Sequence, residues 1–71
     1  MSEFDQAYFE TIYFENYDRL YTAFLKRTGS DIIAQELTQL TFIKLWQYRH
    51  SYSFELSAIL QLNRKAKQVF I

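Results

Sequence analysis

Turn-forming residues are almost missing from this chain. Its 71 residues include no proline and one glycine, Gly29. Because proline and glycine are the strongest breakers of helices, their scarcity favours long helices. Apolar residues recur at helical spacing on both sides of Gly29. The sequence therefore predicts an all-α fold, a small three-helix bundle, with a fourth helix if the first one breaks near Asn16–Asp18, where side chains can divert backbone hydrogen bonds.

The first helix is expected to run from Glu3 or Asp5 to Thr28. Acidic residues near its start and basic residues in its last turn match the helix dipole. Gly29 is predicted to end this helix in the left-handed conformation, which glycine adopts without strain. The apolar residues of this segment are Phe9, Ile12, Tyr13, Tyr17, Leu20, Tyr21, Phe24 and Leu25.

The second helix is expected to begin after Ser30 or Asp31, either of which can serve as its N-cap, and to end at Tyr48 or Arg49. Its helical spacing predicts one buried stripe and, opposite to it, a polar stripe that carries an apolar residue in its middle. The predicted buried residues are Ile33, Ala34, Leu37, Thr41, Phe42, Leu45 and Trp46.

The third helix is expected to begin after Ser53 or Ser57, and the sequence does not choose between these two caps. No stop signal precedes Ile71, which indicates a helix truncated within its course. Residues 1–71 are thus predicted to form one domain that is cut inside its last helix. The apolar side of this helix is predicted to carry Leu56, Ile59, Leu60, Leu62, Ala66, Val69 and Phe70.

Composition limits the chemistry that this chain can perform. There is no cysteine and one histidine, His50, so neither a disulfide nor a thiolate metal site can stabilise the fold. A small domain then depends on its aromatic residues, which make up 20% of the chain. No carboxylate is spaced to orient His50, and no phosphate-binding loop or carboxylate pair is present. We therefore expect no catalytic residues, no metal and no cofactor, which argues against an enzyme.

Charge is unevenly distributed although the formal net charge is zero. Residues 1–18 contain five acidic and no basic side chains, whereas residues 19–71 contain all eight basic side chains and three acidic ones. Such asymmetry allows one surface to attract phosphate while another repels it, although two ordinary solvated faces would give the same pattern. There is neither a long apolar run nor a signal-peptide layout, which predicts a cytoplasmic protein.

Five short motifs follow one another along the chain. Residues 34–46 fit the pattern A-x-[ED]-L-x-Q-x-x-F-x-x-[LA]-[WY], after F-E-x-I-Y at 9–13, R-L-Y at 19–21 and T-G-S at 28–30. The segment 62–67 adds L-x-x-x-A-K. This series resembles the promoter-binding and core-binding domain, region 2, of the extracytoplasmic-function sigma factors of bacterial RNA polymerase. The resemblance implies a transcription initiation factor.

The resemblance also implies that the second helix binds the clamp helices in the largest subunit of core RNA polymerase. Hydrogen-bond acceptors and an amide group on this helix, surrounded by apolar side chains, would pair there with arginines of the clamp. The family usually has an acidic residue where this chain has Leu40, so the contact would be more apolar here. The clamp-binding residues implied are Gln35, Glu36, Gln39, Leu40 and Ile43.

Promoter DNA is the second partner that the resemblance implies. In the family, the loop before the last helix captures a base flipped out of the melted upstream promoter element, and basic residues of the last helix follow the phosphates. Packing of Tyr52 and Phe54 onto the core is an equally good interpretation of these two residues. The DNA-binding residues implied are His50, Ser51, Tyr52, Ser53, Phe54, Arg64, Lys65 and Lys67.

Other functions compete with this interpretation. The family resemblance leaves room for an anti-sigma factor as a further partner and implies no membrane contact. One alternative is a helical adaptor or inhibitor that binds proteins but no nucleic acid, which fits the neutral net charge. Another alternative is a helix-turn-helix DNA-binding module, which would need shorter helices and a tight turn between the second and third.

Overall fold

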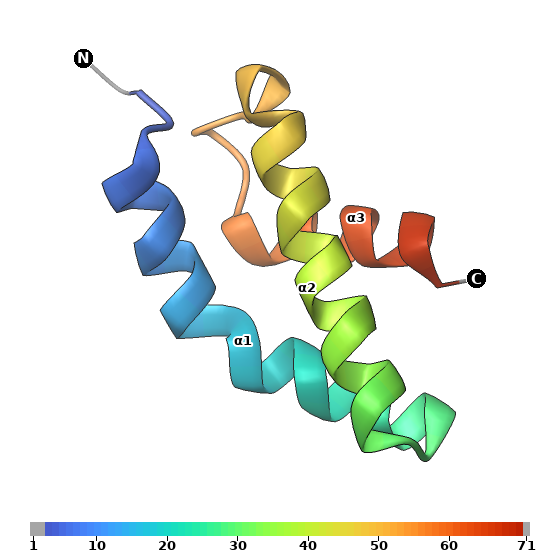
Figure 1. Cartoon of the computed structure of the whole chain (residues 1–71). Coiled ribbons are helices and arrows are strands. Elements are labelled where there is room, and N and C mark those ends of the chain that lie inside the picture. The colour runs from blue at the N-terminus through green and yellow to red at the C-terminus, as the bar shows by residue number, and fades with distance from the viewer. Residues whose placement is uncertain (1–2, 71) are drawn as a thin grey trace.

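The computed structural model describes residues 3–70. Within this range the chain forms α1 (Gln6–Thr28), α2 (Asp31–Gln47), a short 3₁₀ turn η1 (Arg49–Ser51) and α3 (Ala58–Val69), with no strand. The predicted all-α three-helix fold is confirmed. Figure 1 shows α1 and α2 as two long neighbouring helices, with α3 crossing behind α2.

The helix α1 begins at Gln6, directly after its N-cap Asp5, and is not broken. The Asp5 carboxylate accepts a hydrogen bond from the Tyr8 backbone N–H at 2.9 Å. The predicted alternative of a break near Asn16–Asp18 is wrong, because the helix is continuous from Gln6 to Thr28. The buried Asn16 amide donates to the Ile12 carbonyl at 2.9 Å, so it bonds within the helix rather than ending it. The helix nevertheless bends near its middle (Figure 1).

Gly29 joins α1 to α2, as predicted. Its φ of 68° lies in the left-handed region, and its N–H donates to the Leu25 carbonyl at 2.8 Å. Ser30 then caps α2, because its hydroxyl accepts from the Ile33 N–H at 3.3 Å. The third helix, α3, is capped at its start by Ser57, whose hydroxyl accepts a hydrogen bond from the Leu60 N–H at 3.2 Å. Of the two caps predicted for α3, Ser57 is therefore correct.

Replacing Gly29 by alanine is expected to lower the free energy of unfolding by about 1 kcal/mol, because a Cβ is strained at positive φ. No heavy atom lies within 4 Å of the added Cβ, so the loss reflects backbone strain and not a clash. Urea unfolding of Gly29→Ala and Gly29→Asn measures this loss. Asparagine tolerates the left-handed region, so the asparagine variant should lose less; equal losses would contradict the explanation.

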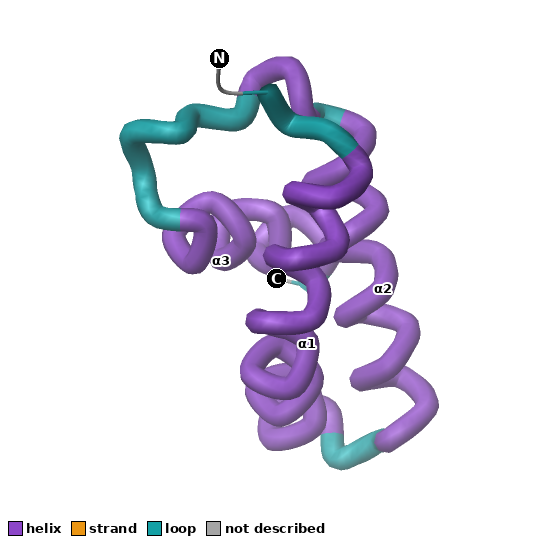
Figure 2. The backbone as a smooth tube through the Cα atoms, turned by 90° about the vertical axis from the view of Figure 1, so that its left-hand side faces the viewer, coloured by secondary structure: helices purple, strands orange, loops and turns teal. Residues whose placement is uncertain are grey.

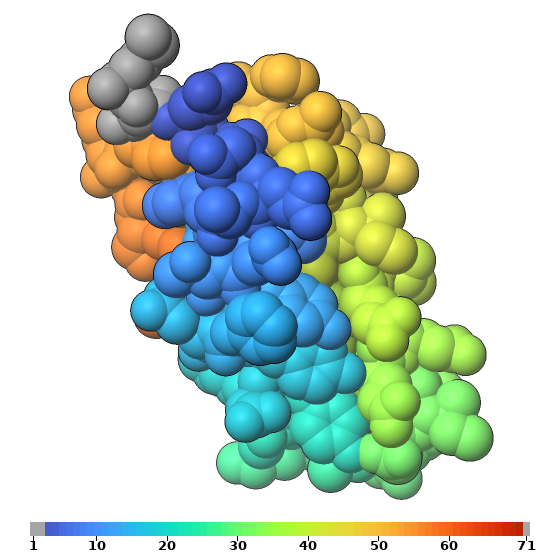
Figure 3. Space-filling view, turned by 60° about the vertical axis from the view of Figure 1, so that its left-hand side comes forward, coloured from blue at the N-terminus to red at the C-terminus, as the bar shows by residue number. Residues whose placement is uncertain are grey.

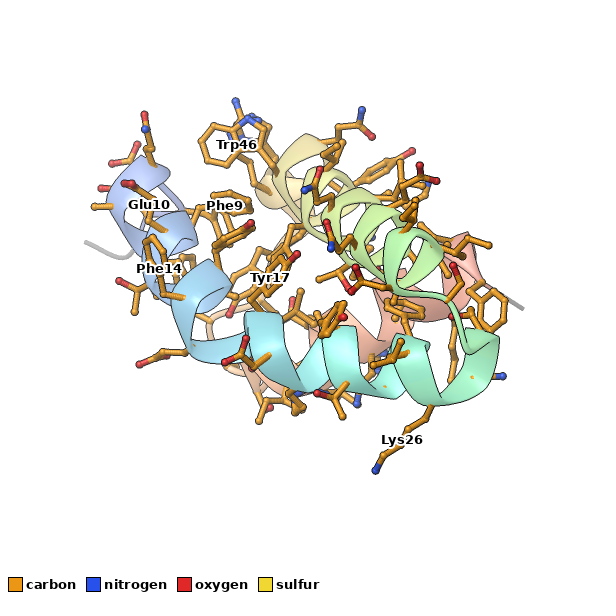
Figure 4. All side chains as sticks on the ribbon, turned by 60° about the horizontal axis from the view of Figure 1, so that its bottom comes forward. Phe9, Glu10, Phe14, Tyr17, Lys26 and Trp46 are labelled. Atoms are coloured by element: carbon orange, nitrogen blue, oxygen red, sulfur yellow. The ribbon has the colours of Figure 1, made fainter. Side chains whose placement is uncertain are left out.

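The centre of the bundle is aromatic. Phe42 of α2 is 2% exposed, and its ring centroid lies 4.7 Å from that of Tyr13 and 6.3 Å from those of Phe9 and Tyr17. Figure 4 shows Phe9 and Trp46 approaching each other from α1 and α2, with their ring centroids 5.2 Å apart. These contacts hold the two long helices together. The other buried apolar side chains are Phe4, Ile12, Leu20, Phe24, Ala34, Leu45 and Leu62.

The buried stripe of α2 differs from the predicted one: Leu37 and Trp46 are half-buried, Ile33 is exposed and Thr38 is buried. Ile33 was predicted to be buried but is 47% exposed, because the buried stripe begins at Ala34 and continues four residues later at Thr38. Thr38 is fully buried although it is polar. Its hydroxyl donates to the Ala34 carbonyl at 2.7 Å, which satisfies the group inside the core.

The apolar side of α3 is narrower than predicted. Leu62 is fully buried, and Ala66, Val69 and Phe70 are half-buried. The predictions for Leu56, Ile59 and Leu60 were wrong: these residues are 42%, 48% and 42% exposed. The physical reason is that Leu56 precedes the helix, and that α3 packs on α2 and hardly on α1, so only one stripe of it is covered.

The end of α3 lies inside the described range. The helix stops at Val69, and Phe70 is extended. Ile71, to which the predicted truncated helix would run, lies outside the described residues. None of the helices between residues 3 and 70 is long and apolar enough to cross a membrane.

Candidate functional site

The predicted clamp-binding residues form one exposed surface on α2. Gln35, Glu36 and Gln39 are exposed, and Leu40 and Ile43 are 46% and 48% exposed. They point outward because the opposite side of the helix supplies the core. Together these five residues, which we call the α2 face, offer one carboxylate and two amides next to two aliphatic side chains.

Ile32, which is not among the predicted clamp-binding residues, extends the α2 face. Ile32 is 70% exposed, although it is aliphatic. It lies four residues before Glu36 and eleven before Ile43, so all three share one side of the helix. This spacing was visible in the sequence, but Ile32 was left unassigned there. An aliphatic stripe is thus added to the polar groups on this surface.

A glutamine holds the loop between α2 and α3, which covers residues 52–57 after η1. Gln61 is 9% exposed, and its side-chain oxygen accepts from the Ser53 N–H at 2.9 Å. Its amide donates to the Ser53 and Leu56 carbonyls at 2.8 and 3.3 Å. Gln61 is not among the predicted site residues, although it is a polar residue between apolar ones on the buried side of α3.

Tyr52 packs into an aromatic cluster at the start of the chain. Its ring centroid lies 4.8 Å from Phe4 and 5.0 Å from Phe54, and its hydroxyl is 3.0 Å from that of Tyr8. Phe54 is more open, at 42% exposed, and also contacts Tyr8. Figure 3 shows the N-terminal half of α1 lying between the loop and the C-terminal end of α2, and Figure 2 shows the course of this loop. The core-packing interpretation therefore applies to Tyr52.

Tyr52 should make the stability of the fold decrease as the pH rises above about 10. Burial and the hydrogen bond with Tyr8 raise the pKa of Tyr52 in the folded state. The folded protein therefore favours the neutral phenol, and this stabilisation is lost as the pH rises through and beyond the unfolded tyrosine pKa of about 10. Urea unfolding of the parent and of Tyr52→Phe between pH 8 and 11 should show the parent's advantage shrinking with pH. A constant difference would contradict this prediction.

The structure brings four of the predicted DNA-binding residues together. Ser51 and Tyr52 of the loop segment and Arg64 and Lys65 of α3 line a hollow of about 150 Å³. We call this the loop hollow; its other lining residues are Leu45, Tyr48, Gln61 and Gln68. The Lys65 ammonium lies 4.6 Å from the centre of the Tyr48 ring, so a cation stands at its rim.

The remaining predicted DNA-binding residues lie apart. His50 and Phe54 line a separate hollow of about 380 Å³ next to Glu3 and Arg49. Ser53 is half-buried and is occupied by its hydrogen bonds with Gln61. Lys67 does not line the loop hollow; it lies between α1 and α3. The eight residues therefore do not form one continuous pocket.

No metal-binding group was found within residues 3–70, where no cluster of three or more His, Cys, Asp or Glu side chains occurs. The α2 face and the loop hollow present hydrogen-bonding, apolar and charged groups. No known protein family, curated protein or solved structure matches this chain. The molecule is, by its fold, a small three-helix domain with an exposed α2 face and a cation-rimmed hollow.

Proposed function

We propose that this domain is a transcription initiation module of the sigma-factor type, which binds the clamp of core RNA polymerase and helps to recognise and melt the upstream promoter element. The observation that carries the proposal is the α2 face. All five residues that the motif at 34–46 marks for clamp binding are exposed on one helix. The motif residues that a bundle needs for its core, such as Ala34 and Phe42, are buried.

The chemistry of the α2 face suits a protein helix that carries arginines. Glu36 offers a carboxylate for charge-assisted hydrogen bonds, and Gln39 offers an amide that both donates and accepts. Leu40, Ile43 and Ile32 supply apolar area around these polar groups. Polar contacts enclosed by an apolar rim exclude water, which is typical of residues that dominate binding energy.

The loop hollow supports the promoter-binding part of the proposal. It combines the phenol of Tyr48 with the cations of Arg64 and Lys65, in a space formed by the loop and α3. An unstacked base needs a pocket with polar groups, and its neighbouring phosphates need cations. The long connection at residues 48–57 between α2 and α3 gives no support to a helix-turn-helix, which needs a tight turn.

The test is a titration of the purified chain with the isolated clamp hairpin of a bacterial RNA polymerase. Glu36→Ala and Gln39→Ala should each weaken binding about fivefold or more, since truncating a dominant interface residue costs more than about 1 kcal/mol. Glu15→Ala, which removes an exposed carboxylate from α1, is the matched control and should bind like the parent. Absence of binding by the folded parent would favour the adaptor alternative.

A further inference from the structure

A basic groove lies between α1 and α3, away from the α2 face. It has a volume of about 380 Å³. Both helices pack on α2 but hardly on each other, and this leaves the space between them open. The residues lining it are Arg19, Leu20, Ala23, Phe24, Arg27, Leu60, Asn63, Arg64, Ala66, Lys67 and Phe70.

The groove has an apolar floor and basic walls. Leu20 and Phe24, both nearly fully buried, form part of the floor. Ala23 of α1 and Ala66 of α3 have small side chains, so the walls do not close over it. Of the residues that line the groove, all within the described range, four are basic and none is acidic. The ligand that fits this charge is a polyanion.

The cations come from both helices and two are held in place. On α1, Arg19 and Arg27 are two helical turns apart, and Nη1 of Arg19 donates to the Asn63 side-chain oxygen at 3.1 Å. The Arg27 guanidinium carbon lies 5.0 Å from the centre of the Phe70 ring. On α3, Arg64 and Lys67 are one turn apart. A chain of anionic groups along the groove would meet a cation from either wall.

Arg64 connects this groove with the loop hollow, because it lines both. The two sites are therefore neighbours that meet at Arg64. Single-stranded nucleic acid has the matching composition, since it alternates flat bases with phosphates. The exposed part of the Phe70 ring beside Arg27 adds a surface for stacking, which an acidic peptide does not require.

We propose that the α1–α3 groove binds the phosphates of a single DNA strand whose neighbouring base occupies the loop hollow. This inference rests on the proposed function and adds Arg19 and Arg27 of α1 to the strand's path. Neither residue belongs to the predicted DNA-binding set. The strand is guided by both helices, with Arg64 at the junction of the two sites.

The experiment measures binding of a fluorescein-labelled oligothymidylate by anisotropy over a range of salt concentrations. For single strands, each phosphate contact contributes about 0.7 to the slope of log K against log salt. Arg19→Gln should therefore reduce the slope by about 0.7, and Arg19→Gln with Arg27→Gln by about 1.4. Lys26→Gln is the matched control, because Lys26 is an exposed cation of α1 that does not line the groove; it should leave the slope unchanged.

The other outcomes overturn the proposal in distinguishable ways. If Lys65→Gln weakens binding while both groove variants behave like Lys26→Gln, the groove inference is wrong and the loop hollow keeps its role. If the folded parent binds no oligothymidylate, DNA binding fails at both sites. Binding of a poly-glutamate peptide that depends on Arg19, without DNA binding, would assign the groove to an acidic protein partner. Thermal unfolding of each variant establishes that it is folded; the single Arg19→Gln variant leaves the Arg27–Phe70 contact intact.

Discussion

Replacing Phe42 by alanine is expected to lower the free energy of unfolding by about 3–5 kcal/mol, the loss measured for buried phenylalanines in other proteins. A 71-residue domain has about 4–10 kcal/mol of stability in total. Phe42 is 2% exposed and lies among Phe9, Tyr13 and Tyr17, all of α1. Its removal leaves a cavity at the contact between the two long helices, and the loss would amount to about a third or more of the total stability.

Urea unfolding followed by circular dichroism measures this loss. Phe14→Ala is the matched control, because Phe14 is 77% exposed and the same atoms are removed. Exposed substitutions usually change stability by less than about 0.5 kcal/mol. Similar losses for Phe42→Ala and Phe14→Ala would show that the aromatic contact between α1 and α2 does not stabilise the fold.

The substitution Gln61→Leu is expected to lower the free energy of unfolding by about 1–2 kcal/mol, because partly buried backbone groups of Ser53 and Leu56 lose their partner. Leucine is similar in size but forms no hydrogen bonds, whereas the Gln61 side chain makes three with the loop. The loop between η1 and α3 should then open more often. The loop hollow, which Gln61 and Tyr52 both line, would lose its fixed shape.

Hydrogen exchange at the Ser53 amide reports this opening directly, together with urea unfolding. Gln68→Leu makes the same change on an exposed position of α3 and should leave both measurements close to those of the parent. Unchanged protection of Ser53 in Gln61→Leu would contradict the role given to Gln61 in holding the loop.

The sequence predicted the helices well because their ends are encoded locally. Asp5, Ser30 and Ser57 form the cap hydrogen bonds, and Gly29 has the positive φ expected of it. Such signals depend on neighbours in the chain and need no knowledge of the fold. The residues assigned to the α2 face are likewise exposed together, since they lie on the opposite side of the helix from the core stripe.

Long-range packing explains what the sequence did not reveal. Leu56, Ile59 and Leu60 are apolar, but their burial depended on whether α3 would pack against one helix or two. The hydrogen bonds of the Gln61 side chain join it to Ser53, eight residues earlier, across an irregular loop. Phe4 is buried by its contact with Tyr52, a residue that is distant from it in the sequence. None of these long-range contacts can be predicted from the spacing of apolar residues along the sequence.

The most direct test of the central claim is nuclear magnetic resonance of the isotope-labelled chain during titration with the isolated clamp hairpin. We expect saturable shifts of the amide signals along the exposed side of α2, from Ile32 to Ile43, with the signals of Arg19 and Lys67 in the α1–α3 groove unchanged. Shifts confined to the groove, or no shifts from a folded chain at high hairpin concentration, would contradict the claim that the α2 face binds the polymerase clamp.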